Sequence, residues 1–200
     1  MARYKGPKDR LSRREGFDIF GKGSKLTRLL VSPGMHGQKR MRSQSQYGKQ
    51  LREKQKVKRI YGVLEKQFRK YINTALKSKS NTGEELLSIL ELRLDNVVYR
   101  LGFTSNRPSA RQIVSHRHVL VNGKKLNIPS YQVKIGDTIT LSSKAISNIE
   151  DVKKVLSQKE PKIPSWLRRK AVVGEVLRKP KLDDIVEPIS MQDIIEFYSR

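Results

Sequence analysis

The side chains of this sequence that could do chemistry are overwhelmingly cationic. Lysine and arginine together number 43 against 19 aspartate and glutamate residues, which gives a formal net charge of +24. Residues 1–60 alone hold 18 basic and 4 acidic side chains. A compact chain with such an excess repels itself unless an anionic partner neutralises it. The composition therefore indicates nucleic acid as the leading partner, with an anionic membrane surface as the alternative.

Residues 1–46 form the first of three segments with candidate phosphate-binding side chains. They show no sustained apolar periodicity, and glycine and proline interrupt them repeatedly. We interpret the segment as a basic arm that becomes ordered on RNA, and the alternative is a tail that stays disordered. The candidate contacts in this arm are Arg3, Lys5, Lys8, Arg10, Arg13 and Arg14.

A helical pattern extends over residues 47–77, because apolar residues recur there at steps of three and four. Basic residues repeat at the same spacing along another face with little acid between them, which favours contact with phosphate over a merely solvated face. Gly62 interrupts the pattern, so two helices or one kinked helix are expected. A further helical pattern covers 84–91. The candidate RNA contacts of the second segment are Tyr47, Lys49, Arg52, Lys54, Lys56 and Arg59.

The third segment, residues 92–141, combines helices with a hairpin. Its apolar pattern predicts a short helix closed by Gly102, and Asn106 is suited to cap a second helix. Asn122-Gly123 is a strong signal for a two-residue hairpin, since both turn positions need a positive φ. A strand is expected at 138–141.

The helix that Asn106 caps and the hairpin at Asn122-Gly123 together predict a basic surface in this segment. Arg107 and Arg111 are four residues apart and share one helical face, close to a helix N-terminus whose N–H groups and dipole attract phosphate. Basic side chains also edge the hairpin. Such a surface suits a structured RNA backbone that is recognised by shape more than by sequence. The candidates are Arg107, Arg111, His116, Arg117, Lys124 and Lys125.

Other residues allow sharper interpretations that the pattern does not favour. Asp95 stands in an Arg-Leu-Asp tripeptide like that of the catalytic aspartate in several pseudouridine synthases, but no catalytic domain fits outside 84–160. We expect Asp95 to pair with an arginine such as Arg93 or Arg100. For Trp166, the only tryptophan, a packing anchor is favoured over base stacking.

Metal, membrane and export signals are also weak. His116 and His118 alternate, but the sequence contains no cysteine and no nearby carboxylate cluster, so neither a metal nor a cofactor is predicted. Apolar runs are too short to span a bilayer, so no membrane partner is expected. The sequence begins without the apolar stretch that a signal peptide needs.

Several strings in this chain carry a resemblance to a known family. Residues 92–141 resemble the α-L RNA-binding motif, which is the domain named after the S-four ribosomal protein. That motif also occurs in RNA-modifying enzymes and in a tRNA synthetase, but further strings are similar to the bacterial-type S-four family of small-subunit ribosomal proteins. These strings occupy residues 2–8, 11–16, 33–37, 47–62, 164–167 and 197–200.

The resemblance implies an α+β fold in which an α-L RNA-binding domain, a small antiparallel sheet packed on helices, is inserted into a helical domain. It implies a basic N-terminal arm at 1–46, a helical domain at 47–90 completed by a C-terminal helix at 189–200, and an inserted region at 91–188 whose α-L domain covers about 92–155. The chain would be a structural constituent of the small ribosomal subunit and not an enzyme.

The resemblance also implies partners and a place in the cell. The chain would bind small-subunit ribosomal RNA directly, act early in assembly and support translational accuracy. It would neighbour the third and fifth small-subunit proteins near the path by which messenger RNA enters. The ribosome would be cytoplasmic, or one encoded within an organelle.

Two departures from the family pattern add expectations. Some relatives carry a cysteine zinc knuckle in the arm, and its absence here predicts no zinc. Many relatives place glutamate three residues after the helix cap, where this chain has Ser109, so a weaker cap is expected. Two rival functions remain at this point: an enzyme that uses an α-L module to reach RNA, and a free RNA-binding module such as a ribosome-rescue factor.

Overall fold

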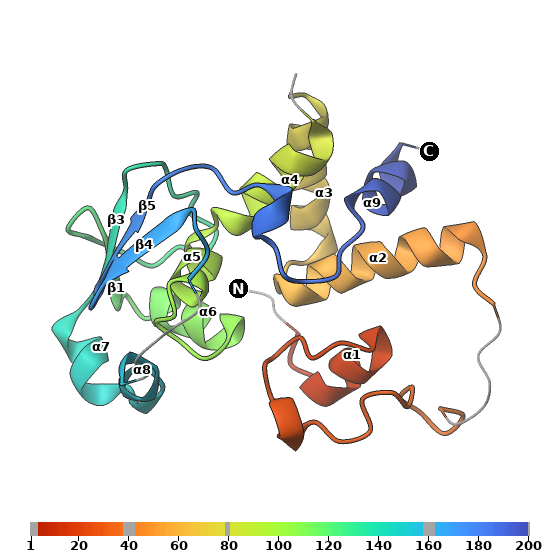
Figure 1. The fold of residues 1–200 in the computed structure, drawn as a ribbon, viewed down its shortest axis with the longest axis horizontal. Helices are drawn as coiled ribbons and strands as arrows, with labels where there is room; N and C mark the ends of the chain where they lie inside the picture. The colour runs from red at the N-terminus through yellow and green to blue at the C-terminus, as the bar shows by residue number, and fades with distance from the viewer. Residues whose placement is uncertain (1–3, 38–42, 79–80, 158–162, 200) are drawn as a thin grey trace. The chain divides into compact units, whose positions relative to one another are not determined.

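The computed structural model describes residues 4–37, 43–78, 81–157 and 163–199. The chain divides into two units: unit 1 comprises residues 1–83 and 187–200, and unit 2 comprises residues 84–186 (Figure 1). Unit 1 is helical, whereas unit 2 holds a five-stranded sheet with helices. The predicted α+β class is confirmed.

Gly62 divides the long helical pattern of unit 1 as predicted. Helix α2 (Gln46–Ile60) ends before it and α3 (Glu65–Leu76) begins after it. Gly62 takes φ of 62°, a conformation that strains any residue with a Cβ. The N–H of Val63 then donates to the carbonyl of Lys58 at 2.9 Å, which closes the end of α2.

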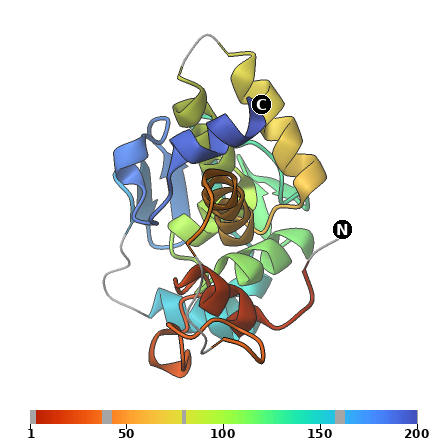
Figure 2. The ribbon, with the colours of Figure 1, turned by 90° about the vertical axis from the view of Figure 1, so that its right-hand side faces the viewer.

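Helix α9 (Met191–Tyr198) lies beside α2 and α3 (Figures 1 and 2). Ser190 caps it by accepting a hydrogen bond from the N–H of Asp193. Apolar side chains that recur along these three helices are withdrawn from water, and that burial stabilises a bundle whose helices are too short to persist alone. The fully or almost fully buried ones are Val57, Ile60, Phe68, Ile72, Ala75 and Ile194.

The N-terminal segment contains a helix that periodicity does not predict. Helix α1 (Lys8–Glu15) ends at Gly16, which has φ of 64°, and the 3-10 helix η1 (Gly23–Lys25) follows. Arg13 donates to the carbonyls of Val31 and Ser32 at 3.0 and 3.2 Å. Such side-chain to backbone bonds leave no periodic trace in a sequence, which is why this order was not foreseen.

Unit 2 is built on an antiparallel sheet with the strand order β2-β1-β3-β5-β4. Asn122 and Gly123 have φ of 49° and 78°, and Val121 pairs with Lys124, so the predicted two-residue hairpin is confirmed. The strand expected at 138–141 is also confirmed. The strands are β1 (Val119–Val121), β2 (Lys124–Leu126), β3 (Thr138–Leu141), β4 (Leu167–Lys170) and β5 (Val173–Val176).

Helices α5 and α6 cover the inner face of this sheet (Figure 1). Trp166 is 1% exposed within the same core, so its predicted role as a packing anchor is confirmed. Gly174 of β5 faces α5 so closely that an added Cβ would lie 2.3 Å from Leu101 Cδ1. The helices of unit 2 are α4 (Thr82–Glu91), α5 (Leu94–Arg100), α6 (Arg107–Ser115), α7 (Ser143–Asn148), α8 (Glu150–Leu156) and the 3-10 helix η2 (Leu182–Asp184).

Candidate nucleic-acid interface

The N-terminus of α6 is capped as predicted but is not open. Asn106 Oδ1 accepts a hydrogen bond from the N–H of Ser109 at 2.9 Å. Ser109 Oγ donates to Asp151 Oδ2 at 2.5 Å, and the N–H of Ser105 donates to the same oxygen at 3.4 Å. Helix α8 thus supplies a carboxylate that Ser109 lacks, and this carboxylate stands at the helix end where we expected a phosphate.

The two arginines of α6 are held by the neighbouring helix α5. Arg107 Nε donates to Asn96 Oδ1 at 2.8 Å, and its guanidinium lies 4.5 Å from the centre of the Tyr99 ring. Arg111 Nη1 lies 3.3 Å from Asp95 Oδ2. The arginines share one face of the surface, as their spacing predicts, and each is already oriented by the protein.

Asp95 and Glu91 organise this face from below. Arg93 donates two hydrogen bonds, 3.1 and 2.7 Å long, to Asp95, so the predicted pairing of Asp95 with Arg93 is confirmed. Arg100 grips Glu91 instead, at 3.0 and 2.8 Å. We call the four side chains Arg93, Arg100, Arg107 and Arg111 the arginine cluster.

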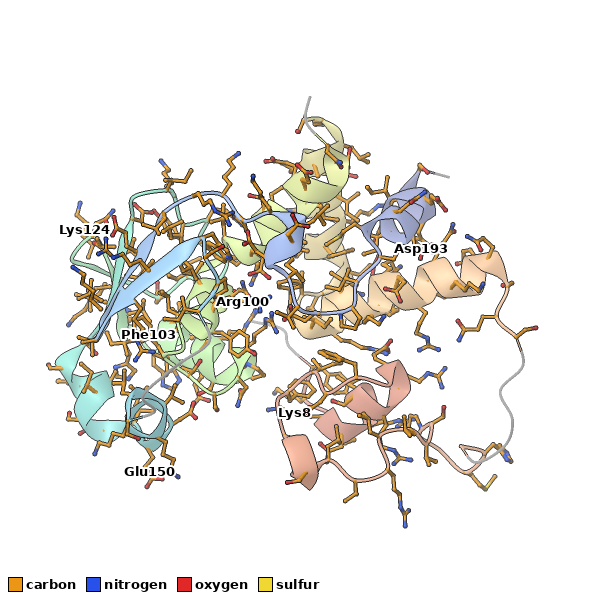
Figure 3. The ribbon with its side chains drawn as sticks, viewed as in Figure 1. Lys8, Arg100, Phe103, Lys124, Glu150 and Asp193 are labelled. Carbon is orange, nitrogen blue, oxygen red and sulfur yellow. The ribbon has the colours of Figure 1, made fainter. Side chains whose placement is uncertain are left out.

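The hairpin edge offers exposed cations. Lys124 and Lys125 are exposed on β2, an edge strand, and Figure 3 shows Lys124 at the outer border of unit 2. Arg117 is exposed in a left-handed turn with φ of 62°. His116 ends α6 rather than lying on a strand, and its ring centre is 6.3 Å from that of His118. His116 and Arg117 therefore lie between α6 and β1, whereas Lys124 and Lys125 lie on the edge strand β2.

In unit 1, the candidates of the arm differ in how open they are. Lys5, Lys8, Arg10 and Arg14 are exposed, whereas Arg13 is half-buried by its bonds to backbone carbonyls. Arg3 lies outside the described residues.

Most candidates on α2 are tied to carboxylates. Arg59 forms an ion pair with Glu15, whose side chain is buried, and Arg52 lies 3.6 Å from the same carboxylate. Lys56 pairs with Glu53 at 2.6 Å. The exposed candidates on this helix are Lys49 and Tyr47, which also stacks on Phe197 with ring centres 5.6 Å apart.

Comparison with known proteins identifies the family. A model described as the ribosomal protein S4/S9 N-terminal domain matches residues 3–91, and the S4 domain matches residues 92–139. The chain is 49% identical over 209 residues to the small ribosomal subunit protein uS4 of Dictyoglomus turgidum. It is 51% identical over 210 residues to that of Trichlorobacter lovleyi and 50% identical over 211 residues to that of Caldicellulosiruptor bescii, and every alignment spans 100% of both chains. This chain belongs to the uS4 family.

Membership of the uS4 family excludes the catalytic interpretation of Asp95. The family consists of small ribosomal subunit proteins, so the chain is a structural protein and not an enzyme, as predicted. The chain has the cysteine-free form expected from the resemblance. Among the residues that the structure describes, no group of three or more His, Asp or Glu side chains is placed to hold a metal ion. In the same residues, no helix has the length and apolarity that crossing a membrane requires.

Lys54 has a packing role in this uS4 family member that its charge did not indicate. Its side chain is buried, its ammonium lies 3.2 Å from Glu65 Oε1, and it stands 4.3 Å from the centre of the Phe197 ring. Lys58 and Tyr198 also donate to Glu65, at 2.5 and 2.7 Å. Burial opposes the charged form of Glu65, but these three hydrogen bonds outweigh it and lower its pKa to about 2.

Acid should therefore weaken unit 1 through Glu65. A carboxylate whose pKa is lower in the folded than in the unfolded chain stabilises the fold above its ordinary pKa of about 4.5, and that contribution is lost as pH falls toward 2. We expect Glu65→Gln to melt at a lower temperature than the unmodified chain at about pH 7, and the difference to shrink by about pH 2.5. Melting followed by circular dichroism measures it, with exposed Glu150→Gln as the control. A difference that stays constant would contradict this pairing.

Two further exposed cations were missed by the sequence analysis. Arg168 and Lys170 lie on β4, two residues apart, and strand pairing places them on the outer face of the sheet. The same pairings carry that face across to Lys125, through Leu120, Thr140 and Val173. In the sequence Arg168, Arg169 and Lys170 form an unbroken run of charge, so no period-two alternation of charge was available as a signal. Arg169 between them points inward and donates to the carbonyls of Leu101 and Gly102.

Proposed function

We propose that this chain binds small-subunit ribosomal RNA directly as a structural constituent of the small ribosomal subunit. Its exposed cations support this, because the hairpin edge and the arm present lysine and arginine on a uS4 family member with a net charge of +24. Each neutralised phosphate releases a condensed counterion, which drives binding without reading a base. The fixed arrangement of the arginine cluster then favours one RNA shape over others.

The three parts of the chain would divide this work. The arm at 1–46 would follow the RNA backbone, the helical domain at 47–90 with 189–200 would add contacts through Tyr47 and Lys49, and the inserted region at 91–188 would dock its arginine cluster and hairpin edge. A single protein that holds several RNA segments together favours the early steps of small-subunit assembly. We propose that this chain acts at that stage.

The same proposal extends to neighbours and location. The third and fifth small-subunit proteins would lie beside the chain, near the path by which messenger RNA enters, so that its position supports translational accuracy. The ribosome concerned would be cytoplasmic, or encoded within an organelle.

Salt dependence of RNA binding tests the central claim. We expect the full chain to bind a bacterial small-subunit ribosomal RNA transcript with an affinity that falls by roughly 10³–10⁵ between about 50 and 200 mM salt, as six to ten phosphate contacts require. Filter binding measures this, with a large-subunit transcript fragment of equal length as the control. A flat salt dependence, or equal affinity for both transcripts, would overturn the proposal.

A further inference from the structure

Two buried carboxylates, one at the end of α4 and one in α5, lie beneath the arginines of α5 and α6 that we expect to contact a polyanion. Glu91 and Asp95 are only 1% and 5% exposed as residues, and each is gripped through two hydrogen bonds by an arginine. A buried charge is costly unless it is paired, so the pairing explains why both carboxylates are tolerated. It does not explain what they contribute, because a buried ion pair adds little stability compared with an apolar pair of similar size.

We propose that Asp95 and Glu91 are positioning residues that hold arginines in place for RNA phosphates, so that two negative side chains increase affinity for a negative ligand. This inference rests on the proposed function. Within the arginine cluster, Arg93 and Arg111 both contact Asp95, Arg100 pairs with Glu91, and Arg107 bonds to the amide of Asn96. An arginine that is already fixed loses less rotamer freedom when a phosphate arrives.

Asp95 acts on Arg111 directly. One side of the carboxylate is fixed by Arg93, whose side chain is 2% exposed, and the oxygen Oδ2 also lies 3.3 Å from Arg111 Nη1. Arg111 retains 21% of its side-chain surface in contact with solvent. Asp95 therefore links the buried Arg93 to Arg111, whose side chain is still partly exposed to solvent.

Glu91 acts on Arg107 through an amide. Glu91 Oε2 accepts a hydrogen bond of 2.8 Å from Asn96 Nδ2, which fixes the orientation of that amide. Asn96 Oδ1 consequently faces Arg107 and accepts from its Nε at 2.8 Å. The ring of Tyr99 supports the guanidinium at 4.5 Å, so its plane is set from two directions.

Charge and position predict opposite effects, and this makes Asp95→Asn decisive. The substitution removes a negative charge, so charge alone would tighten RNA binding and steepen its salt dependence. Positioning instead predicts binding to the small-subunit transcript that is about three- to tenfold weaker, with no steeper salt dependence. Glu91→Gln should behave in the same way. The measurement is the dissociation constant over a series of salt concentrations.

Glu150→Gln supplies the matched control for charge. Glu150 has 85% of its side chain exposed, lies at the start of α8 (Figure 3), and pairs only loosely with Lys154 at 3.6 Å. Its loss should leave affinity unchanged or slightly raised. If the folded Asp95→Asn chain binds as tightly as Glu150→Gln, the positioning role is refuted although RNA binding stands. If the unmodified chain does not bind the transcript, the proposed function itself fails.

Substitutions at Tyr99 test whether a fixed arginine increases RNA affinity without changing the charge of the chain. Tyr99→Leu removes the ring beneath Arg107, whereas Tyr99→Phe keeps it. We expect about threefold weaker binding for the leucine variant and normal binding for the phenylalanine variant, with folding checked by circular dichroism. If Asp95→Asn does not fold, Glu91→Gln tests the inference together with this pair, and the inference is overturned if neither Glu91→Gln nor Tyr99→Leu weakens binding.

Discussion

Replacing Trp166 with alanine should lower the free energy of unfolding of unit 2 by about 3–5 kcal/mol. The indole is 1% exposed and belongs to the core in which α5, α6 and the sheet meet. Its removal loses the transfer free energy of a large ring and leaves a cavity that a five-stranded sheet cannot readily close. Urea unfolding followed by circular dichroism measures the loss, and Trp166→Phe should recover part of it.

The same variant separates packing from base stacking. If Trp166 stacked on RNA, alanine would reduce RNA affinity while leaving the free energy of unfolding within about 0.5 kcal/mol of the unmodified chain, as surface substitutions usually do. Because the ring is buried, we expect Trp166→Ala to lower the free energy of unfolding strongly and to have a smaller effect on the RNA affinity of the folded chain. A nearly unchanged unfolding transition would contradict the buried position.

Replacing Arg117, Lys124 and Lys125 together with glutamine should weaken RNA binding strongly. All three are exposed, Arg117 in the turn before β1 and the two lysines on the edge strand β2. If each neutralises one phosphate, the slope of log affinity against log salt should become shallower by about 2–3. Binding of the small-subunit transcript at several salt concentrations gives this slope.

Three lysines elsewhere in unit 2 provide a control with the same change of charge. Lys144, Lys153 and Lys154 are exposed on α7 and α8. Their replacement by glutamine should change the slope much less, because position matters as well as net charge. Equal losses for both triple variants would mean that the hairpin edge is not a distinct contact surface.

Local signals predicted the elements that depend on backbone chemistry. Gly62 ends a helix because only glycine takes its φ without strain, Asn106 caps α6 with its own side chain, and Asn122-Gly123 forms the hairpin. Each of these outcomes depends on residues within a few positions of one another. A single sequence contains all the information that such features need.

Features that depend on distant residues escaped prediction. Strands β4 and β5 are joined at Ala171, which takes φ of 50° without the glycine or asparagine that marks such a turn, and β4 reads as a run of charge. Lys54 appeared to be a phosphate ligand because its partners Glu65 and Phe197 come from other helices. The sequence can show that a lysine is present, but only the fold shows that its charge is already neutralised.

The return of the chain to unit 1 has a consequence for its synthesis. Helix α9 packs on α2, yet it follows α2 only after the whole of unit 2. During translation, most of unit 2 therefore leaves the exit tunnel before α9 and can begin to fold while the apolar side of α2 still lacks its last helix. We expect the nascent chain to expose that side until α9 leaves the exit tunnel, and chaperones that recognise apolar helices would have their best opportunity to bind in this interval.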